Sequence, residues 1–204
     1  MKIYLIPPSE SKQMWGVSDH DLMVHIFDMS EPVTAAISAT EKTLKCTGKR
    51  YLQAMELNNT IYTNPVLPAI QRYTGVMYKS LWYDSLSASE KKYIKAHVYI
   101  LSWLRGILKP NDMISNYKLP VTTSLAKYRK PLVTEYIIDQ SPTVIVNLLP
   151  GTYMKMVDWN KLESTGIAIY TPEFHKPDGS TYTHGIKKVR GERLREQSSN
   201  YCNK

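Results

Sequence analysis

The segment Thr143–Leu148 constrains the fold of this chain most strongly, because its sequence TVIVNL is dense in β-branched residues. Such residues favour strands, where branched side chains pack well on a pleated, covered surface. Residues 2–6, KIYLI, form a second short apolar run, which a pair of prolines ends. Residues 98–101 and 167–170 have the same character. The sequence therefore predicts several short buried strands.

Helical segments separate these runs. Ser30 stands before a Glu-Pro pair, and Ser as N-cap with Pro in the first turn predicts a helix that runs toward Lys45. Ser87 and Glu90 form a capping box, since each can satisfy a backbone donor of the other. Further helices are expected at residues 49–57, after Asn64-Pro65, around 131–139, and from about 185 to 197.

The order of these elements indicates the fold class. Asp178-Gly179 is a hairpin signal, so residues 168–174 and 180–184 are expected to pair. Strands and helices alternate, but unevenly. We therefore expect an α+β or mixed α/β fold, in which a single compact domain spans residues 1–204.

The charge balance is basic, with 26 Lys and Arg against 18 Asp and Glu, or a net +8. A basic surface attracts polyanions, most often nucleic acid or an anionic membrane face. The two cysteines and five histidines show no metal-ligand spacing, so we expect no metal and no cofactor. No stretch approaches the roughly 20 apolar residues of a membrane helix. The expectation is a soluble cytoplasmic protein.

The strongest local signal for function is the basic run at residues 184–195. A helical period places Lys187, Lys188 and Arg195 on one face, with Gly191 among them. A helix glycine costs about 1 kcal/mol relative to alanine, and close approach of a phosphate backbone would explain it. Ile186, Val189 and Leu194 would then face the core. The alternative is a solvated helix whose glycine packs against a neighbour.

Three further segments could carry function. The loop after the first strand holds Glu10 and Lys12, which could bind an anion or perform acid–base chemistry, although short polar loops are common. In residues 101–119, Arg105 and Lys118 interleave with aromatic residues. This pattern is typical of sites that hold bases and phosphates, but a buried turn with aromatic packing would give the same pattern. Residues 42–51 suit a helix–hairpin–helix-like element with a glycine between two helical stretches, although many helix pairs share that feature.

Taken in order, these segments resemble the YaaA family. The opening residues 6–12 are similar to the family's PPSEGK start, and residues 72–78 to its (Y/F)xGxxY segment. Residues 101–119 are similar to LSGLYGxLxPxDxIxxYRL, and residues 146–155 to NLxSxEYxKxV. The closing KKxRGxxxR resembles Lys187–Arg195. Lys118, Trp103, Pro150 and Thr152 depart from these motifs, so no acid–base role carries over to the last two positions.

The resemblance implies a protein that protects against hydroperoxide by limiting iron-promoted DNA damage. It also implies a mixed central sheet surrounded by helices, a helix–hairpin–helix-like element and a basic cleft that binds DNA, with no established cofactor or reaction. Family members continue beyond the closing helix, so the chain is expected to lack a C-terminal extension. The expected partner is double-stranded DNA, bound with low sequence specificity. The predicted contacts are Lys12, Arg105, Lys118, Lys187, Lys188, Arg190 and Arg195.

A second hypothesis stays open. The chain could be an enzyme that acts on a nucleobase or nucleotide, like a lyase or glycosidase, in a polar pocket around Lys12. The candidate catalytic residues are Glu10, Lys12, Asp112 and Tyr117. This hypothesis predicts a deep pocket with perturbed pKa values instead of an open groove. The sequence leaves open whether the protein is catalytic.

Overall fold

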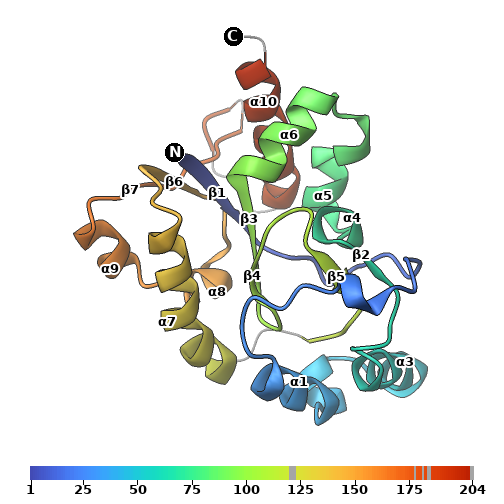
Figure 1. Ribbon diagram of the computed structural model, residues 1–204. Helices are drawn as coiled ribbons and strands as arrows, with labels where there is room; N and C mark the ends of the chain where they lie inside the picture. The colour runs from blue at the N-terminus through green and yellow to red at the C-terminus, as the bar shows by residue number, and fades with distance from the viewer. Residues whose placement is uncertain (120–122, 177, 181, 183–184, 203–204) are drawn as a thin grey trace.

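A computed structural model describes residues 1–119, 123–176, 178–180, 182 and 185–202 (Figure 1). Its main sheet has five strands in the order β4-β3-β1-β6-β7. The central strand is β1 (Lys2–Ile6), which pairs in parallel with β3 (Val98–Ser102) and β6 (Val144–Asn147). β7 (Ala168–Tyr170) extends the parallel part, and β4 (Gly106–Leu108) is antiparallel to β3. The mixed α/β prediction is therefore confirmed.

β1 lies at the centre because both of its faces are apolar. Ile3 and Leu5 belong to one core cluster, and Tyr4 and Ile6 belong to the other. Residues that alternate along a strand point to opposite faces, and a strand covered on both faces reads as an uninterrupted apolar run. The run that the sequence analysis identified thus predicted the burial of this strand on both sides.

Two groups of helices cover the two faces (Figure 1). One face packs against α1 (Ser30–Ile37), α7 (Thr123–Asp139) and α9 (Trp159–Ser164). The other face packs against α4 (Ala69–Arg72), α5 (Val76–Leu81), α6 (Ala88–His97) and α10 (Ile186–Cys202).

The remaining elements lie at the edges of this arrangement. They are η1 (His20–Leu22), α2 (Glu41–Leu44), α3 (Gly48–Asn59), η2 (Tyr83–Ser85) and α8 (Gly151–Met154). A separate two-stranded sheet pairs β2 (Val66–Pro68) with β5 (Met113–Ser115) in antiparallel fashion. Within the described ranges, no helix combines the length and apolar character needed to cross a bilayer.

Several predicted boundaries need correction. The helix that begins at Ser30 ends at Ile37 and does not run toward Lys45, because the Thr40 side chain caps the separate helix α2. Ser30 is not the N-cap either: its backbone N–H and hydroxyl both donate to Asp28. The strand β2 follows Asn64-Pro65 directly, and the helical turn expected there begins only at Ala69, as α4. The capping box of Ser87 and Glu90 is confirmed.

The prediction that residues 168–174 form the first strand of a hairpin is wrong. β7 pairs in parallel with β6, through Ile145 and Ile169 among others, and so belongs to the main sheet. The turn itself is present, since Lys176 N–H donates to the carbonyl of Ser180 at 2.8 Å and Gly179 adopts a φ of +81°. Residues 181, 183 and 184, in the second half of the predicted pair, lie outside the described residues.

Candidate functional site

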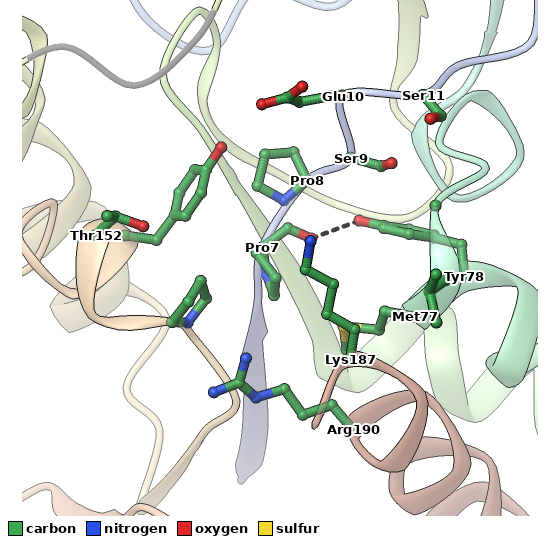
Figure 2. A pocket seen from close by; sticks show the side chains of 14 residues that line it. Pro7, Pro8, Ser9, Glu10, Ser11, Met77, Tyr78, Thr152, Lys187 and Arg190 are labelled. Carbon is green, nitrogen blue, oxygen red and sulfur yellow. Dashed lines mark hydrogen bonds between the residues drawn. The ribbon is translucent and has the colours of Figure 1, made fainter. Parts of the chain in front are cut away.

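The candidate site lies where the parallel strands end. The loop of residues 7–12 leaves the carboxyl end of β1, the edge of a sheet at which open α/β proteins commonly bind ligands. A cavity of about 520 Å³ opens there. Its walls come from this loop, the start of α5, α8 and α10 (Figure 2). The lining residues are Pro7, Pro8, Ser9, Glu10, Ser11, Gly75, Val76, Met77, Tyr78, Pro150, Thr152, Tyr153, Lys187 and Arg190.

Lys187 and Arg190 give the cavity its positive charge. Both extend from α10 into the cavity, three residues apart and therefore on the same helix face (Figure 2). In the described part of the chain, no ion pair within 4.0 Å involves either residue. The Nε of Arg190 is buried without a hydrogen-bond partner, and this burial lowers the pKa of its guanidinium. Such a pair of cations can receive an anion from solution.

Contacts with α5 hold the loop in place. The hydroxyl of Tyr78 donates to the carbonyl of Pro7 at 2.8 Å, as the dashed line in Figure 2 shows. Gly75 packs so closely on Ser9 that a β-carbon at position 75 would overlap the Ser9 hydroxyl. Thr74 N–H also donates to the carbonyl of Ser11 at 2.9 Å. The wall of the cavity is therefore fixed by backbone and side-chain contacts.

Lys12 occupies an aromatic environment beside this cavity. Its Nζ lies 4.2 Å from the ring centroid of Tyr117 and 5.7 Å from that of Tyr73. Burial, together with the nearby cations Lys118 and Arg72 and against the opposing effect of Glu10, lowers the pKa of Lys12 to about 7. The Lys12 amine is therefore available in its neutral form near neutral pH.

The tyrosines beneath Lys12 form a hydrogen-bonded chain. The hydroxyls of Tyr73 and Tyr117 lie 2.9 Å apart, and Tyr117 lies 2.8 Å from the hydroxyl of Ser102 at the end of β3. Burial raises the pKa of Tyr73 well above its usual value, and burial also raises that of Tyr117. Both phenols stay neutral, so they can donate or accept hydrogen bonds.

A smaller hollow at Lys12 adjoins the main cavity. It is lined by Lys12, Lys118, Tyr117, Trp103 and Leu119, and it shares the four residues Pro8, Ser9, Glu10 and Tyr153 with the main cavity. Lys118 lies 3.7 Å from the carboxylate of Glu10. Three of the four candidate catalytic residues, Glu10, Lys12 and Tyr117, thus come together.

The fourth candidate, Asp112, lies elsewhere. Its carboxylate accepts a hydrogen bond from the backbone N–H of Lys109 at 2.7 Å, within the turn between β4 and β5. Burial raises the pKa of this carboxyl. Asp112 lines neither hollow, and the structure gives it a role in turn geometry.

Arg105 is also placed differently from its predicted role. Its side chain is only 2% exposed, and it donates to the hydroxyl of Ser115 at 2.8 Å. In this position the guanidinium cannot meet a phosphate from solution. The alternative interpretation of the 101–119 segment, a buried turn with aromatic packing, describes Arg105 and Trp103 better.

The basic residues of α10 do not form a single binding surface. Lys188 pairs with Glu192 at 3.6 Å. Arg195 donates to the carbonyls of Leu81 and Trp82, at 3.0 and 3.2 Å, and thereby closes the C-terminal end of α5. Of the predicted α10 contacts, only Lys187 and Arg190 line the cavity.

Gly191 and the predicted apolar face of α10 also need correction. Gly191 packs against the backbone of α5, which leaves no room for a phosphate. Leu194 is buried, but Ile186 and Val189 are only half-buried. The neighbouring helix α5 therefore explains this glycine.

Some lining residues were absent from the predicted set. Tyr78 and Tyr153 both line the cavity, and Tyr78 donates to the carbonyl of Pro7, but neither carries a charge that would mark it in the sequence. Their places in the family-like motifs were the available signal. Among the described residues, no group of three or more His, Cys, Asp or Glu could hold a metal ion.

The environment of Lys12 leads to a first prediction. Acylation of the Lys12 amine should follow a titration with a midpoint near pH 7, since only the neutral amine reacts and its pKa is lowered to about 7. Replacing Lys118 with methionine should raise that midpoint, because a neighbouring positive charge is removed. Competitive acetylation followed by peptide mass spectrometry measures both. A midpoint near the ordinary lysine value of about 10.4 would contradict the arrangement.

Comparison with known proteins adds a family relationship. The family model described as peroxide stress protein YaaA matches residues 1–204. A UPF0246 protein of Phocaeicola vulgatus is 32% identical over 143 residues, which are 63% of this chain and 56% of that protein. One from Porphyromonas gingivalis is 30% identical over 139 residues, 62% of this chain and 52% of that protein. One from Rickettsia felis is 31% identical over 134 residues, 60% and 53% of the two chains. These matches span about half the length of the curated relatives.

Proposed function

Since this chain belongs to the peroxide stress protein YaaA family, we propose that it is a cytoplasmic DNA-binding protein that helps limit iron-promoted oxidative damage. Its proposed ligand is double-stranded DNA. The proposed contact surface is the part of the cavity that Lys187 and Arg190 line. The link to peroxide stress comes from the description of the family.

One observation supports the proposal above the others: two neighbouring cations face an open cavity without a carboxylate partner among the described residues. Surface cations of this kind gain affinity for a phosphate backbone by releasing its counterions. Contacts with phosphate position a protein on DNA but do not read base sequence. The expected binding is therefore of low sequence specificity, and the net charge of +8 adds to the attraction.

The α2–α3 pair supplies a second proposed contact. The helices are joined through Lys45, which adopts a left-handed φ of 52°, and Gly48, which adopts a φ of 56°. Four basic side chains and one carboxylate, that of Glu41, line the hollow between the helices; the basic residues are Lys42, Lys45, Lys49 and Arg50. Such a short, basic helix pair suits a helix–hairpin–helix-like contact with phosphates.

A salt series tests the proposal directly. Fluorescence anisotropy with a labelled duplex should show micromolar or tighter binding at low salt. Lys187→Ala/Arg190→Ala should weaken it, and the slope of log affinity against log salt should fall by roughly 2, about 0.9 for each lost phosphate contact. Lys92→Ala/Lys95→Ala, which removes two exposed cations from α6, is the matched control for net charge.

Three outcomes separate the possibilities. If Lys187→Ala/Arg190→Ala and Lys92→Ala/Lys95→Ala weaken binding equally, the affinity comes from the general charge of the protein and not from the cavity. A third double variant, Lys49→Ala/Arg50→Ala, tests the α2–α3 pair, which is the DNA site if this variant alone weakens binding. No binding by the wild-type protein at low salt would refute DNA binding for this chain.

A second candidate function has its own support. The cavity of about 520 Å³ and the neutral amine beside it fit an enzyme that acts on a nucleobase or nucleotide. An enzyme of this kind needs a reactive group at the cavity, and Lys12 is the residue whose environment supplies one.

A further inference from the structure

Lys12 is held in a way that a purely structural lysine does not need. Two flanking backbone hydrogen bonds, from Gln13 N–H to the carbonyl of Arg72 and from Thr74 N–H to that of Ser11, fix its position beside Tyr73. Its ammonium has three donors, but it makes a single hydrogen bond of 3.3 Å, to the carbonyl of Glu10.

No carboxylate of the described residues lies within 4.0 Å of Lys12, because the Glu10 carboxylate pairs with Lys118. Covered lysines are normally paired with an acidic group. Here the neighbours are two aromatic faces and a second cation, Lys118. The two ring faces attract the ammonium, but burial and the charge of Lys118 favour the neutral amine, which is the nucleophilic form.

The adjoining cavity indicates what this amine would meet. Lys187 and Arg190 can bind a phosphate in the main cavity, while Glu10 and Tyr153 line both hollows. A ligand with a phosphate at one end could therefore extend from the α10 cations toward Lys12. A sugar phosphate has this form, and its open-chain aldehyde is an electrophile that a neutral amine attacks.

We propose that Lys12 forms an imine with the aldehyde of a phosphorylated sugar that binds in this cavity. The proposal uses the cavity of the proposed function but does not depend on DNA binding. The sugar could be a free sugar phosphate or an abasic site in DNA, since both present the same aldehyde and phosphate chemistry.

The chemical step balances without a further reactant. The lone pair of the Lys12 nitrogen attacks the carbonyl carbon, and one of its two N–H protons passes to the carbonyl oxygen to give a carbinolamine. The second N–H proton passes to the hydroxyl, which leaves as water, and a C=N bond replaces the C=O bond. Water reverses the step. Tyr117 holds the Lys12 amine over its ring face, while its hydroxyl bonds with those of Tyr73 and Ser102.

Borohydride trapping tests the imine. The full chain is incubated at pH 7 with cyanoborohydride and 2-deoxyribose 5-phosphate, or with a duplex that carries one abasic site. Intact mass and peptide mapping then locate the reduced adduct. We expect the adduct at Lys12, at a rate at least tenfold above that at the exposed Lys49. An ordinary lysine is neutral roughly a thousandfold less often at this pH than an amine that titrates near 7.

Two sets of variants complete the design. Lys12→Arg keeps the positive charge but removes the nucleophile and should abolish the selective adduct, while circular dichroism confirms folding. Lys187→Ala/Arg190→Ala should slow trapping of the phosphorylated sugar but not of unphosphorylated 2-deoxyribose. Equal labelling of Lys12 and Lys49, or an unchanged adduct yield in Lys12→Arg, would overturn the proposal.

The two substrate arms identify the source of the aldehyde. Selective adduct formation with the free sugar phosphate alone supports a small-molecule substrate, and formation with the abasic duplex alone supports a DNA substrate. If neither gives a selective adduct, the imine proposal fails. Binding of an intact duplex is measured separately, by the anisotropy experiment described above. Failure of DNA binding and failure of imine formation can therefore be distinguished.

Discussion

Gly191→Ala should destabilise the protein by about 2–3 kcal/mol, within the range of core overpacking. The new β-carbon would lie 2.9 Å from Cβ of Ser80 and 3.0 Å from the backbone nitrogen of Leu81, and closer still to the carbonyl oxygen of Met77. Two of these three atoms belong to the backbone of α5 and cannot rotate away. The higher helix propensity of alanine offsets only about 1 kcal/mol.

Thermal and urea unfolding measure this effect. For a domain of this size the expected loss corresponds to a fall in Tm of roughly 5–10 °C. Gly151→Ala is the matched control, because a β-carbon there meets nothing within 4 Å, and its free energy of unfolding should stay within about 0.5 kcal/mol of wild type. A Gly191→Ala protein as stable as this control would show that α10 does not pack on α5 at this distance.

Arg72→Met should cost about 3–5 kcal/mol of unfolding free energy, because several buried acceptors lose their donor at once and each such loss costs about 1–3 kcal/mol before relaxation. Arg72 is 0% exposed and donates to four backbone carbonyls, those of Gln13, Trp15, Pro65 and Ile114. Burial lowers its pKa to about 10, so it remains charged at neutral pH. Methionine keeps much of the length but leaves these acceptors without their donor.

Arg72→Lys should fall between wild type and Arg72→Met, because a single ammonium cannot match the fork of a guanidinium. Arg50→Met, at an exposed position of α3, controls for the loss of one arginine. Urea unfolding gives the stabilities, and limited proteolysis should show earlier cleavage near residues 13–15 in Arg72→Met. An Arg72→Met protein within about 1 kcal/mol of wild type would mean that these carbonyls find other donors.

An element could be predicted from the sequence where the residues that determine it lie close together along the chain. The apolar run of residues 2–6, the capping box of Ser87 and Glu90, and the basic C-terminal helix are patterns of residues close in sequence, and the sequence predicted the element at each. The break between α1 and α2 was also local, but the competing cap at Thr40 went unrecognised.

The candidate site was predicted in part. Lys12, Lys187 and Arg190 were identified from the loop after β1 and from the basic run. Lys187 and Arg190 line the main cavity, and Lys12 lines the smaller hollow beside it. The pairing of Arg195 with the end of α5 joins residues more than 110 positions apart, so no local pattern could reveal it.

By itself, the sequence determined the buried strands, the basic character of α10 and the loop that carries Lys12. Only the tertiary structure decided which charges reach solvent. Arg72 and Arg105 look like any other basic residues in the sequence, yet both are buried and hydrogen-bonded to distant segments. The physical reason is that charge belongs to the residue, whereas burial and hydrogen-bond partners depend on what the rest of the chain places around it.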